Sequence, residues 1–313
     1  MYLDKLIFLT ILIALLIVTS YISIYHGTNN PLIINYRLTR VLSVILSGLV
    51  IGFNASYLQS CLRNPLVDHY ILGVGSGAVF STYLAFTILS TNIFLLTSVF
   101  AVAGGLLALV ITITVSEYLG GSDYAYILVG IGVNSLFSGL TILFSQIAMR
   151  KLTIPHPMLM LIGSFINASS KNIPYLLATL IATIISYPLL SKPLNTIILG
   201  DYYSKQLGYN PRIARFTTIV LAGTTASIVV SIHGTIGFVG LVSPHLSRLS
   251  MKTADQRFVA PSSALLSSIL LLLTDTMSRT LLAKSIGEIP AGAIVSIIGA
   301  PLFIYMLISR FRK

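Results

Sequence analysis

Long stretches of the chain carry no Asp, Glu, Lys or Arg. They lie at 6–36, 41–62, 70–116, 124–149, 152–170, 172–191, 216–247 and 289–309, and a shorter one, 258–274, ends at Asp275. A transmembrane helix needs about 20 mostly apolar residues to cross about 30 Å of hydrocarbon. The runs 70–116 and 216–247 are each long enough for two spans. This pattern predicts an all-α protein that crosses a membrane many times.

Segment 152–170 differs from the others, because Pro155 and Pro157 open it and only Met158–Phe165 is strongly apolar. We expect a short half-helix there, on the outer side, that does not cross the bilayer. The remaining pattern predicts about ten spans, near 6–25, 41–61, 70–89, 93–116, 124–148, 173–191, 216–232, 236–249, 259–278 and 291–309. The stretch 6–25 is longer than the apolar core of a signal peptide, and no A-x-A cleavage site follows, so we expect it to be retained as a span.

Composition narrows the class of protein further. Of 313 residues, 55% are hydrophobic and 9% are charged, whereas a soluble domain carries about 25% charged residues. A soluble enzyme, a secreted disulfide scaffold and a disordered chain are therefore excluded. Cys61 is the only cysteine, which excludes a disulfide framework within the chain and a thiolate metal cluster.

The basic residues predict the orientation. The net charge of +11 is explained by positive loops at an anionic cytoplasmic leaflet and gives no reason to expect nucleic acid. If both termini are cytoplasmic, twelve Lys/Arg face inward: Lys5, Arg63, Lys192, Lys205, Arg212, Arg215, Arg248, Lys252, Arg257, Arg310, Arg312 and Lys313. Seven face outward: Arg37, Arg40, Arg150, Lys151, Lys171, Arg279 and Lys284. The majority favours an N-in, C-in topology, and the seven outer residues need a separate reason.

The loops are short, so we expect one transmembrane domain over 1–313 with a single sizeable cytoplasmic insertion at 192–215. Within the insertion we expect two short helices, Asn195–Leu199 and Asp201–Leu207, with Asp201 as N-cap and stops at Gly200 and Gly208.

An internal repeat is also predicted. Arg37-x-x-Arg40 is followed eight residues later by Gly48, and Arg212-x-x-Arg215 is followed at the same distance by Gly223. Five predicted spans separate the two copies, which would therefore be inverted across the membrane, as in many transporters.

The sequence offers little for catalysis. No G-x-x-x-x-G-K-[ST] motif exists, so the chain has no P-loop for nucleotide. The glycines of Gly73–Gly77 open a predicted span and favour close helix packing. The five histidines form neither an i, i+4 pair nor an H-E-x-x-H motif, so we expect no metal site. An intramembrane enzyme would lack a credible set of acids, metal ligands or nucleophile and base.

Asp275 is the one acid inside a predicted span, and Arg279 follows it at i+4, the spacing of an intrahelical ion pair. A carrier driven by a proton or sodium gradient needs intramembrane acids. A single acid gives that alternative, an ion-gradient-driven secondary transporter of a small solute, little support.

Six motifs follow one another along the chain: Arg37-Leu-Thr-Arg40, Gln59 to Gly73, Leu194 to Gly208, Gly234 to Arg248, Asp275 to Arg279, and Glu288 to Phe303. In this order they resemble the FecCD family of ABC-importer permeases, which carry cobalamin, haem and iron–siderophores. Together they cover nearly the whole chain. The resemblance implies a subunit that alternates access and is not itself an enzyme.

The resemblance also implies partners. Two permeases, alike or merely similar, would pair in a prokaryotic plasma membrane above two ATPase subunits, with a substrate-binding protein docking outside. ATP and Mg²⁺ would be used by the ATPase, and this chain would bind no cofactor.

Roles for individual residues follow from the same resemblance. Arg37, Arg40 and Arg279 would meet acidic residues of the binding protein, which supplies a reason for outward basic residues. Leu199, Gly200, Asp201, Leu207 and Gly208 would frame the helix that couples to the ATPase. The loop at Ser122 and Asp123 would form the cytoplasmic gate.

Three departures concern the fine geometry of the family pattern. Thr39 stands where the family has Pro, Asp68 stands where it has a second Pro after Asn64-Pro65, and Arg279 and Glu288 are about two residues farther apart than usual.

For the translocation pathway the candidates are Gln59, Asn64 and Asn134, polar groups on apolar spans, each of which could equally be a packing contact. The sequence does not choose among the chelates.

Overall fold

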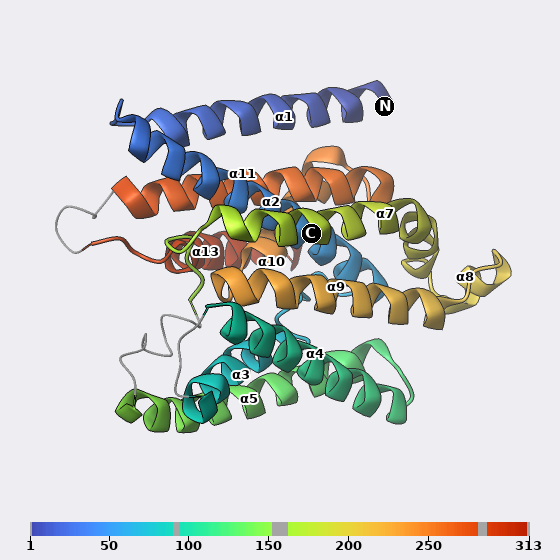
Figure 1. The fold of residues 1–313 in the computed structure, drawn as a ribbon. Helices are drawn as coiled ribbons and strands as arrows, with labels where there is room; N and C mark the ends of the chain where they lie inside the picture. Colours follow the sequence, from blue (N-terminus) through green and yellow to red (C-terminus); the bar gives the residue numbers. More distant parts are fainter. Residues whose placement is uncertain (1, 90–93, 152–161, 281–286, 312–313) are drawn as a thin grey trace.

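The computed structural model describes residues 2–89, 94–151, 162–280 and 287–311, which form helices and connecting loops with no strand in those ranges. Most helices run side by side, parallel or antiparallel, as Figure 1 shows. The helices are α1 (Tyr2–Tyr25), α2 (Pro31–Cys61), α3 (Val74–Leu89), α4 (Phe94–Tyr118), α5 (Asp123–Lys151), η1 (Ser170–Asn172), α7 (Ile173–Ile197), α8 (Asp201–Gln206), α9 (Pro211–His233), α10 (Val239–Met251), α11 (Gln256–Thr280) and α13 (Ala291–Phe311).

The predicted all-helical, polytopic fold is confirmed, and each of the ten predicted spans has a helix. Within the described ranges, seven helices are long and apolar enough to cross a membrane, and α3 and α13 are shorter apolar helices. The predicted half-helix lies largely outside the described residues, and its described part, 162–169, is not helical.

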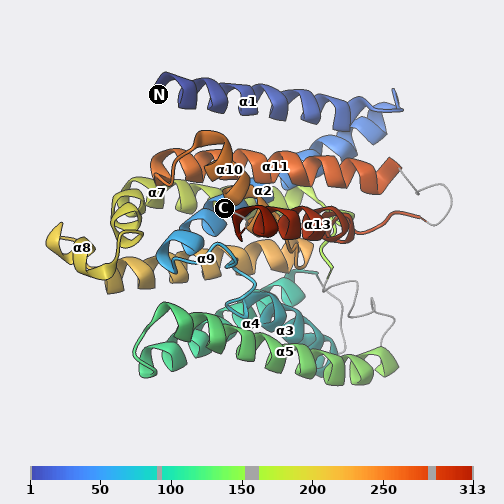
Figure 2. The same ribbon diagram turned by 180° about the vertical axis from the view of Figure 1, so that it is seen from behind.

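The loops divide the bundle into two ends. We call the end that carries α8 the α8 end; the loops α2–α3, α4–α5 and α10–α11 also lie there, and positive-inside counting predicts that it is cytoplasmic. The opposite end, called the far end, carries the α1–α2 turn and the segment that leads into α13. Figure 2 shows the same division from behind, with α8 projecting beyond the other helices.

Helix α2 begins ten residues before its predicted start. Asn30 caps it by accepting a hydrogen bond from the Leu32 amide at 3.0 Å, and Pro31 occupies the first turn, the arrangement that favours a helix N-terminus. Arg37 and Arg40 therefore belong to the first part of this helix, before the charge-free run at 41–62. With 31 residues it is about 46 Å long at 1.5 Å per residue, which is longer than the hydrocarbon core.

Helix α10 has only 13 residues, and an irregular segment precedes it. Backbone groups of that segment would be costly in the membrane without partners. The Gly163 and Ser164 amides donate to the Thr235 and His233 carbonyls at 2.6 and 2.8 Å, and the Gly292 amide donates to the Gly163 carbonyl at 2.9 Å. Three segments that are distant in sequence thus satisfy one another's backbone hydrogen bonds near the far end.

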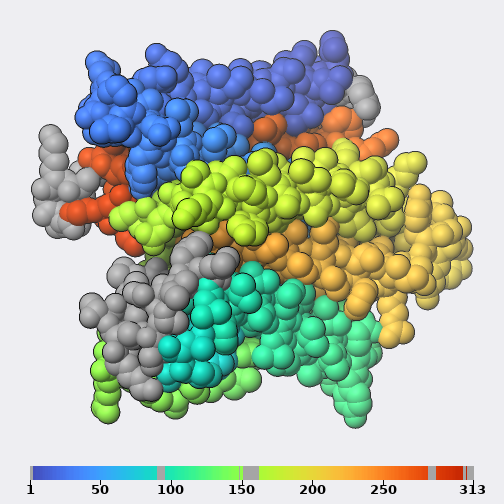
Figure 3. Space-filling model, viewed as in Figure 1, coloured from blue at the N-terminus to red at the C-terminus, as the bar shows by residue number. Residues whose placement is uncertain are grey.

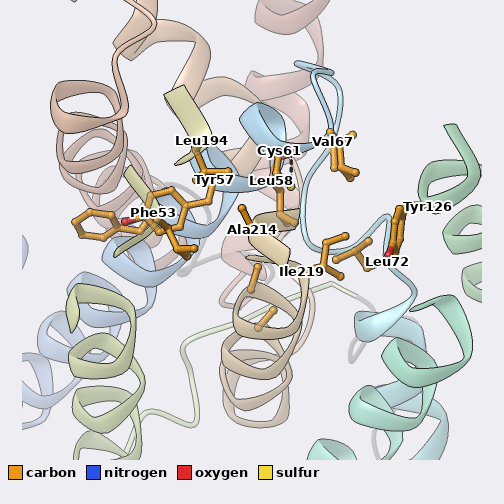
Figure 4. Close-up of a cluster of buried hydrophobic side chains, with 14 of the residues drawn as sticks. Phe53, Tyr57, Leu58, Cys61, Val67, Leu72, Tyr126, Leu194, Ala214 and Ile219 are labelled. Atoms are coloured by element: carbon orange, nitrogen blue, oxygen red, sulfur yellow. Dashed lines mark hydrogen bonds between the residues drawn. The ribbon is translucent and has the colours of Figure 1, made fainter. Parts of the chain in front are cut away.

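A hydrophobic core lies close to the α8 end, where α2, α7 and α9 converge. Figure 4 shows Tyr57, Leu58, Leu194 and Ile219 among its side chains, and all four are fully buried. The core therefore packs together the ends of the helices that flank α8, so a displacement of α8 would act on a tightly packed layer.

Glycines allow α2 and α11 to pack closely. A methyl group at Gly48 would lie 2.5 Å from the Ser268 Cα, and one at Gly52 would lie 2.5 Å from the Ala264 Cα. In the second copy of the predicted repeat, a methyl group at Gly223 on α9 would lie 2.6 Å from the Leu109 side chain on α4. Counted five spans onward, α2 corresponds to α9, and α4 to α11. The pairs α2–α11 and α9–α4 are therefore equivalent, which supports the inverted repeat.

We expect Gly52→Ala to destabilise the protein by at least about 1–3 kcal/mol, the usual cost of overpacking, because the contacted atoms belong to the α11 backbone and cannot rotate away. Gly139→Ala is the matched control, since nothing lies within 4 Å of a methyl group there and alanine favours a helix. Thermal unfolding in detergent would measure both. Equal melting temperatures would contradict the close packing of α2 on α11.

Candidate functional site

The predicted coupling element is α8 with the turns on either side. Gly200 precedes it with φ +119° and Gly208 follows it with φ +83°, conformations that favour glycine. The predicted stop at Gly208 is confirmed. Gly200 takes the N-cap position that we expected for Asp201, which instead begins the first turn. Leu199, Tyr202 and Leu207 are exposed, so the tip of this element presents apolar side chains.

The prediction of a separate helix at Asn195–Leu199 is wrong. Helix α7 continues to Ile197, although Pro188 and Pro193 lie within it. Residues 192–197 of the predicted insertion therefore extend α7, and the segment between α7 and α9 covers 198–210.

Four charged residues meet beside α8, and we call them the coupling cluster: Arg63, Asp123, Asp201 and Arg215. The Arg215 Nη2 atom lies 2.8 Å from Asp123 Oδ1 and 3.2 Å from Asp201 Oδ1. The Arg63 guanidinium lies 2.6 Å from Asp123 Oδ2 and 3.7 Å from Asp201 Oδ1. Each arginine therefore contacts both acids. The Arg215 side chain is 6% exposed, and a buried charge needs such partners.

The coupling cluster joins residues that the sequence placed in two different elements. Asp201 was predicted in the coupling helix and Asp123 in the cytoplasmic gate, and the two arginines bridge them. Ser122, the other predicted gate residue, caps α5 by accepting a hydrogen bond from the Ala125 amide at 3.2 Å. Neither Arg63 nor Arg215 was predicted as a site residue, although Arg63 lies in the motif Gln59 to Gly73 and Arg215 in the predicted repeat.

A second ion pair at the same end is more exposed. Arg212 on α9 contacts Glu117 on α4, and the Arg212 side chain is 77% exposed. Such a pair contributes little, about 0–1 kcal/mol. Arg212 and Arg215 thus share a helix and a charge but differ in burial.

Four further charged residues gather at the far end, and we call them the far-end cluster: Arg40, Asp275, Arg279 and Glu288. Arg40 donates to the Asp275 carboxylate from Nε at 3.0 Å and from Nη2 at 2.6 Å, and it also contacts Glu288. The Arg40 and Asp275 side chains are 1% and 0% exposed. The Arg279 Nε atom lies 3.2 Å from Asp275 Oδ2, which confirms the expected intrahelical pair.

The three predicted docking arginines differ in their contacts. Arg40 lies in the interior, and Arg279 donates to the Ser23 hydroxyl at 2.6 Å. Arg37 is half-buried and donates to the Ile24 and His26 carbonyls at 3.0 and 2.6 Å. In this conformation Arg40 pairs with Asp275 on α11 and Glu288 before α13. Docking of the binding protein stays a prediction for all three arginines.

The predicted pathway residues occupy dissimilar places. Gln59 is 4% exposed, donates to the Gly240 carbonyl at 3.1 Å and accepts from Arg248. Asn64 accepts from the Leu66 amide at 2.9 Å in the turn after α2. Asn134 lines an open hollow of about 360 Å³ bordered by α3, α5, α10 and α13. Asn134 is therefore the candidate with access to open space.

Asp68 also borders that hollow. It lies in the loop between α2 and α3, is 5% exposed, and accepts hydrogen bonds from the Tyr70 and Ile71 amides at 2.9 and 3.2 Å. Burial outweighs these hydrogen bonds and raises the pKa of Asp68 to about 6. Between pH 4 and 6 the folded protein therefore binds the proton more tightly than the unfolded chain does.

The free energy of unfolding should consequently fall as pH rises through this window. We expect Asp68→Asn to be more stable than the wild type at pH 7.5 by up to about 3 kcal/mol, at 1.36 kcal/mol per pKa unit, because asparagine keeps an oxygen acceptor without the charge. At pH 4 the difference should vanish. Melting temperatures at both pH values would measure it, and an equal gain at the two would contradict a raised pKa.

The described residues contain no group of three or more His, Cys, Asp or Glu side chains arranged to hold a metal ion.

Comparison with known proteins gives consistent matches over most of the chain. The model of the FecCD transport family matches residues 6–309. The hemin transport system permease protein HmuU of Yersinia pestis is 31% identical over 285 residues, which cover 88% of this chain and 83% of HmuU. The molybdate import system permease protein MolB of Haemophilus influenzae is 33% identical over 276 residues, covering 87% and 79%.

The fold matches as well. A solved structure described as a metal-chelate type ABC transporter in an inward-facing conformation superposes with a TM-score of 0.87 at 29% identity, covering 97% of this chain and 99% of the other. Sequence and structure therefore agree with the resemblance seen in the six motifs. The chain belongs to the FecCD transport family and is a multi-pass permease of the prokaryotic plasma membrane.

Proposed function

We propose that this permease imports a metal chelate, such as haem, an iron–siderophore or cobalamin, by alternating access. It would work as one of two permeases above two ATPase subunits and would receive its cargo from a substrate-binding protein outside the membrane. Relatives named for hemin and molybdate transport support a metal-containing cargo. This chain supplies conformational change and the ATPase supplies energy.

The observation that carries the proposal is the coupling cluster. A push on α8 from an ATPase would displace Asp201, and Arg215 and Arg63 connect Asp201 to Asp123 at the start of α5. Because Arg215 is nearly buried and belongs to α9, motion of α8 would reach both α5 and α9. This supports α8 as the coupling helix and the α4–α5 loop as the gate.

The far-end cluster weakens the case for an ion-driven carrier. Such a carrier needs an intramembrane acid that can bind and release a cation. Asp275 has no exposed surface and is paired with Arg40 and Arg279. Its carboxylate is therefore already neutralised by the guanidinium groups of the protein itself, which a transported ion would have to replace.

The test is uptake into proteoliposomes that contain the permease with the ATPase and the binding protein from the same genome. Labelled haem, a ferric siderophore, cobalamin and molybdate would be offered in parallel, with and without internal ATP. We expect uptake of one cargo only when ATP and the ATPase are present. Uptake without ATP that follows a proton or sodium gradient would contradict the proposal.

A further inference from the structure

A groove of about 900 Å³ lies between α4, α7 and α9. The space-filling view in Figure 3 shows these helices side by side on one face of the bundle. Val102, Ala103, Ala178, Ala182 and Val220 are among the side chains that line the groove, and the small alanines leave room where larger residues would fill it. In a membrane, an apolar groove on such a face is open to lipid.

Two polar atoms at one end of the groove have no hydrogen-bond partner. They are Asn172 Nδ2 and Ser98 Oγ, both buried, and both residues line the groove. Asn172 is 2% exposed and precedes α7 without capping it through its side chain. A buried donor without a partner costs about 1–3 kcal/mol, so these atoms favour a ligand that brings an acceptor oxygen.

Their position indicates what kind of ligand. Ser98 is the fifth residue of α4 and Asn172 immediately precedes α7, so both lie near the far end. They are close to the starts of the spans predicted at 93 and 173, where the hydrocarbon would meet the polar headgroups. Lys171, beside Asn172, is exposed and would favour a phosphate. On α9 the groove extends from Phe216 to Ile232, sixteen residue steps or about 24 Å at 1.5 Å per residue. This length exceeds the depth of one leaflet of a core about 30 Å thick.

We infer that the groove is a binding site for a phospholipid of the outer leaflet. An ester carbonyl of the lipid accepts hydrogen bonds from Asn172 Nδ2 and Ser98 Oγ, the phosphate lies near Lys171, and one acyl chain fills the apolar groove. A second copy of the chain would also bury the apolar walls, and the experiment below distinguishes it from a lipid. This site is separate from the proposed cargo pathway and does not depend on which chelate is carried.

The probe is a phosphatidylglycerol with a photoreactive diazirine on its acyl chain, mixed into phosphatidylethanolamine vesicles that contain the full-length permease. After illumination, mass spectrometry of peptides locates the label. We expect the label to concentrate on α4, α7 and α9. Ala182→Phe, which fills the groove, should reduce that labelling about tenfold, equivalent to about 1.4 kcal/mol of binding free energy.

Ile184→Phe is the matched control, because Ile184 is exposed on α7 and does not line the groove; its labelling should be unchanged. Asn172→Leu should also lower the labelling of the groove and gives an independent test if Ala182→Phe fails to fold. Label spread evenly over all membrane-facing helices and unaffected by either variant would overturn the site. Absence of label from α4, α7 and α9 while the other membrane-facing helices are labelled would overturn it in favour of an interface between copies that covers the groove.

Discussion

Arg215→Ala should nearly abolish ATP-driven uptake while ATP hydrolysis continues. The substitution removes the buried guanidinium that contacts Asp123 at 2.8 Å and Asp201 at 3.2 Å. Loss of one partner of a buried pair costs about 3–5 kcal/mol, and Arg63 would still hold Asp123 at 2.6 Å, so we expect the helices to remain folded. The ratio of cargo transported to ATP hydrolysed in proteoliposomes measures the effect.

Arg212→Ala is the matched control for this experiment, because Arg212 lies on the same helix, carries the same charge and is 77% exposed. Its effect should be small. A double-mutant cycle of Arg215→Ala with Asp201→Ala should show non-additive losses, since the residues are in contact. Normal coupled transport by Arg215→Ala would remove the coupling cluster from the mechanism.

Arg40→Leu should destabilise the fold strongly, by about 3–5 kcal/mol, because it leaves the buried Asp275 carboxylate without its main partner. Arg279, 3.2 Å from the same carboxylate, would offset part of the loss. Adding Asp275→Asn should recover stability, since the unpaired charge is then gone. Thermal unfolding in detergent compares the single and double variants.

A substitution at Arg37 tests docking of the binding protein at the far end separately from stability of the fold. Arg37→Glu should lower the melting temperature less than Arg40→Leu does, because Arg37 is only half-buried and loses hydrogen bonds to two carbonyls but no ion pair. It should weaken binding of the substrate-binding protein, more so at low salt, where charges are least screened. If Arg40→Leu instead weakened docking with an unchanged melting temperature, the far-end cluster would be a docking surface and not a structural support.

The spans could be predicted because each needs a local run of apolar residues. The start of α2 could not, because the pattern treated Arg40 as a boundary. Arg40 is tolerated inside the bundle only because it pairs with Asp275 and Glu288, which are 235 and 248 residues away in sequence. Likewise the end of α7 lies beyond Lys192 and Pro193 because the helix packs against the core at Leu194 and Ile197.

The same reason limits the prediction of the site. The glycines that frame α8 could be predicted, since a turn has a local signature. The pairing of Arg215 with two acids from different helices has no such signature, because it exists only after α5, α8 and α9 have packed. Asn172 and Ser98 were missed for a similar reason: their lack of a partner is a property of the packed groove.

Helix α2 is the one element that enters both charged clusters, with Arg40 near its start and Arg63 just past its end. Each residue of an α-helix turns the chain by about 100°. An insertion or deletion of one residue between positions 40 and 63 would therefore rotate one arginine away from its acids while the other stayed in place. The number of residues in this stretch is therefore fixed by the directions in which the two arginines must point around the helix axis. Membrane thickness alone would tolerate a residue more or less, but the two clusters do not.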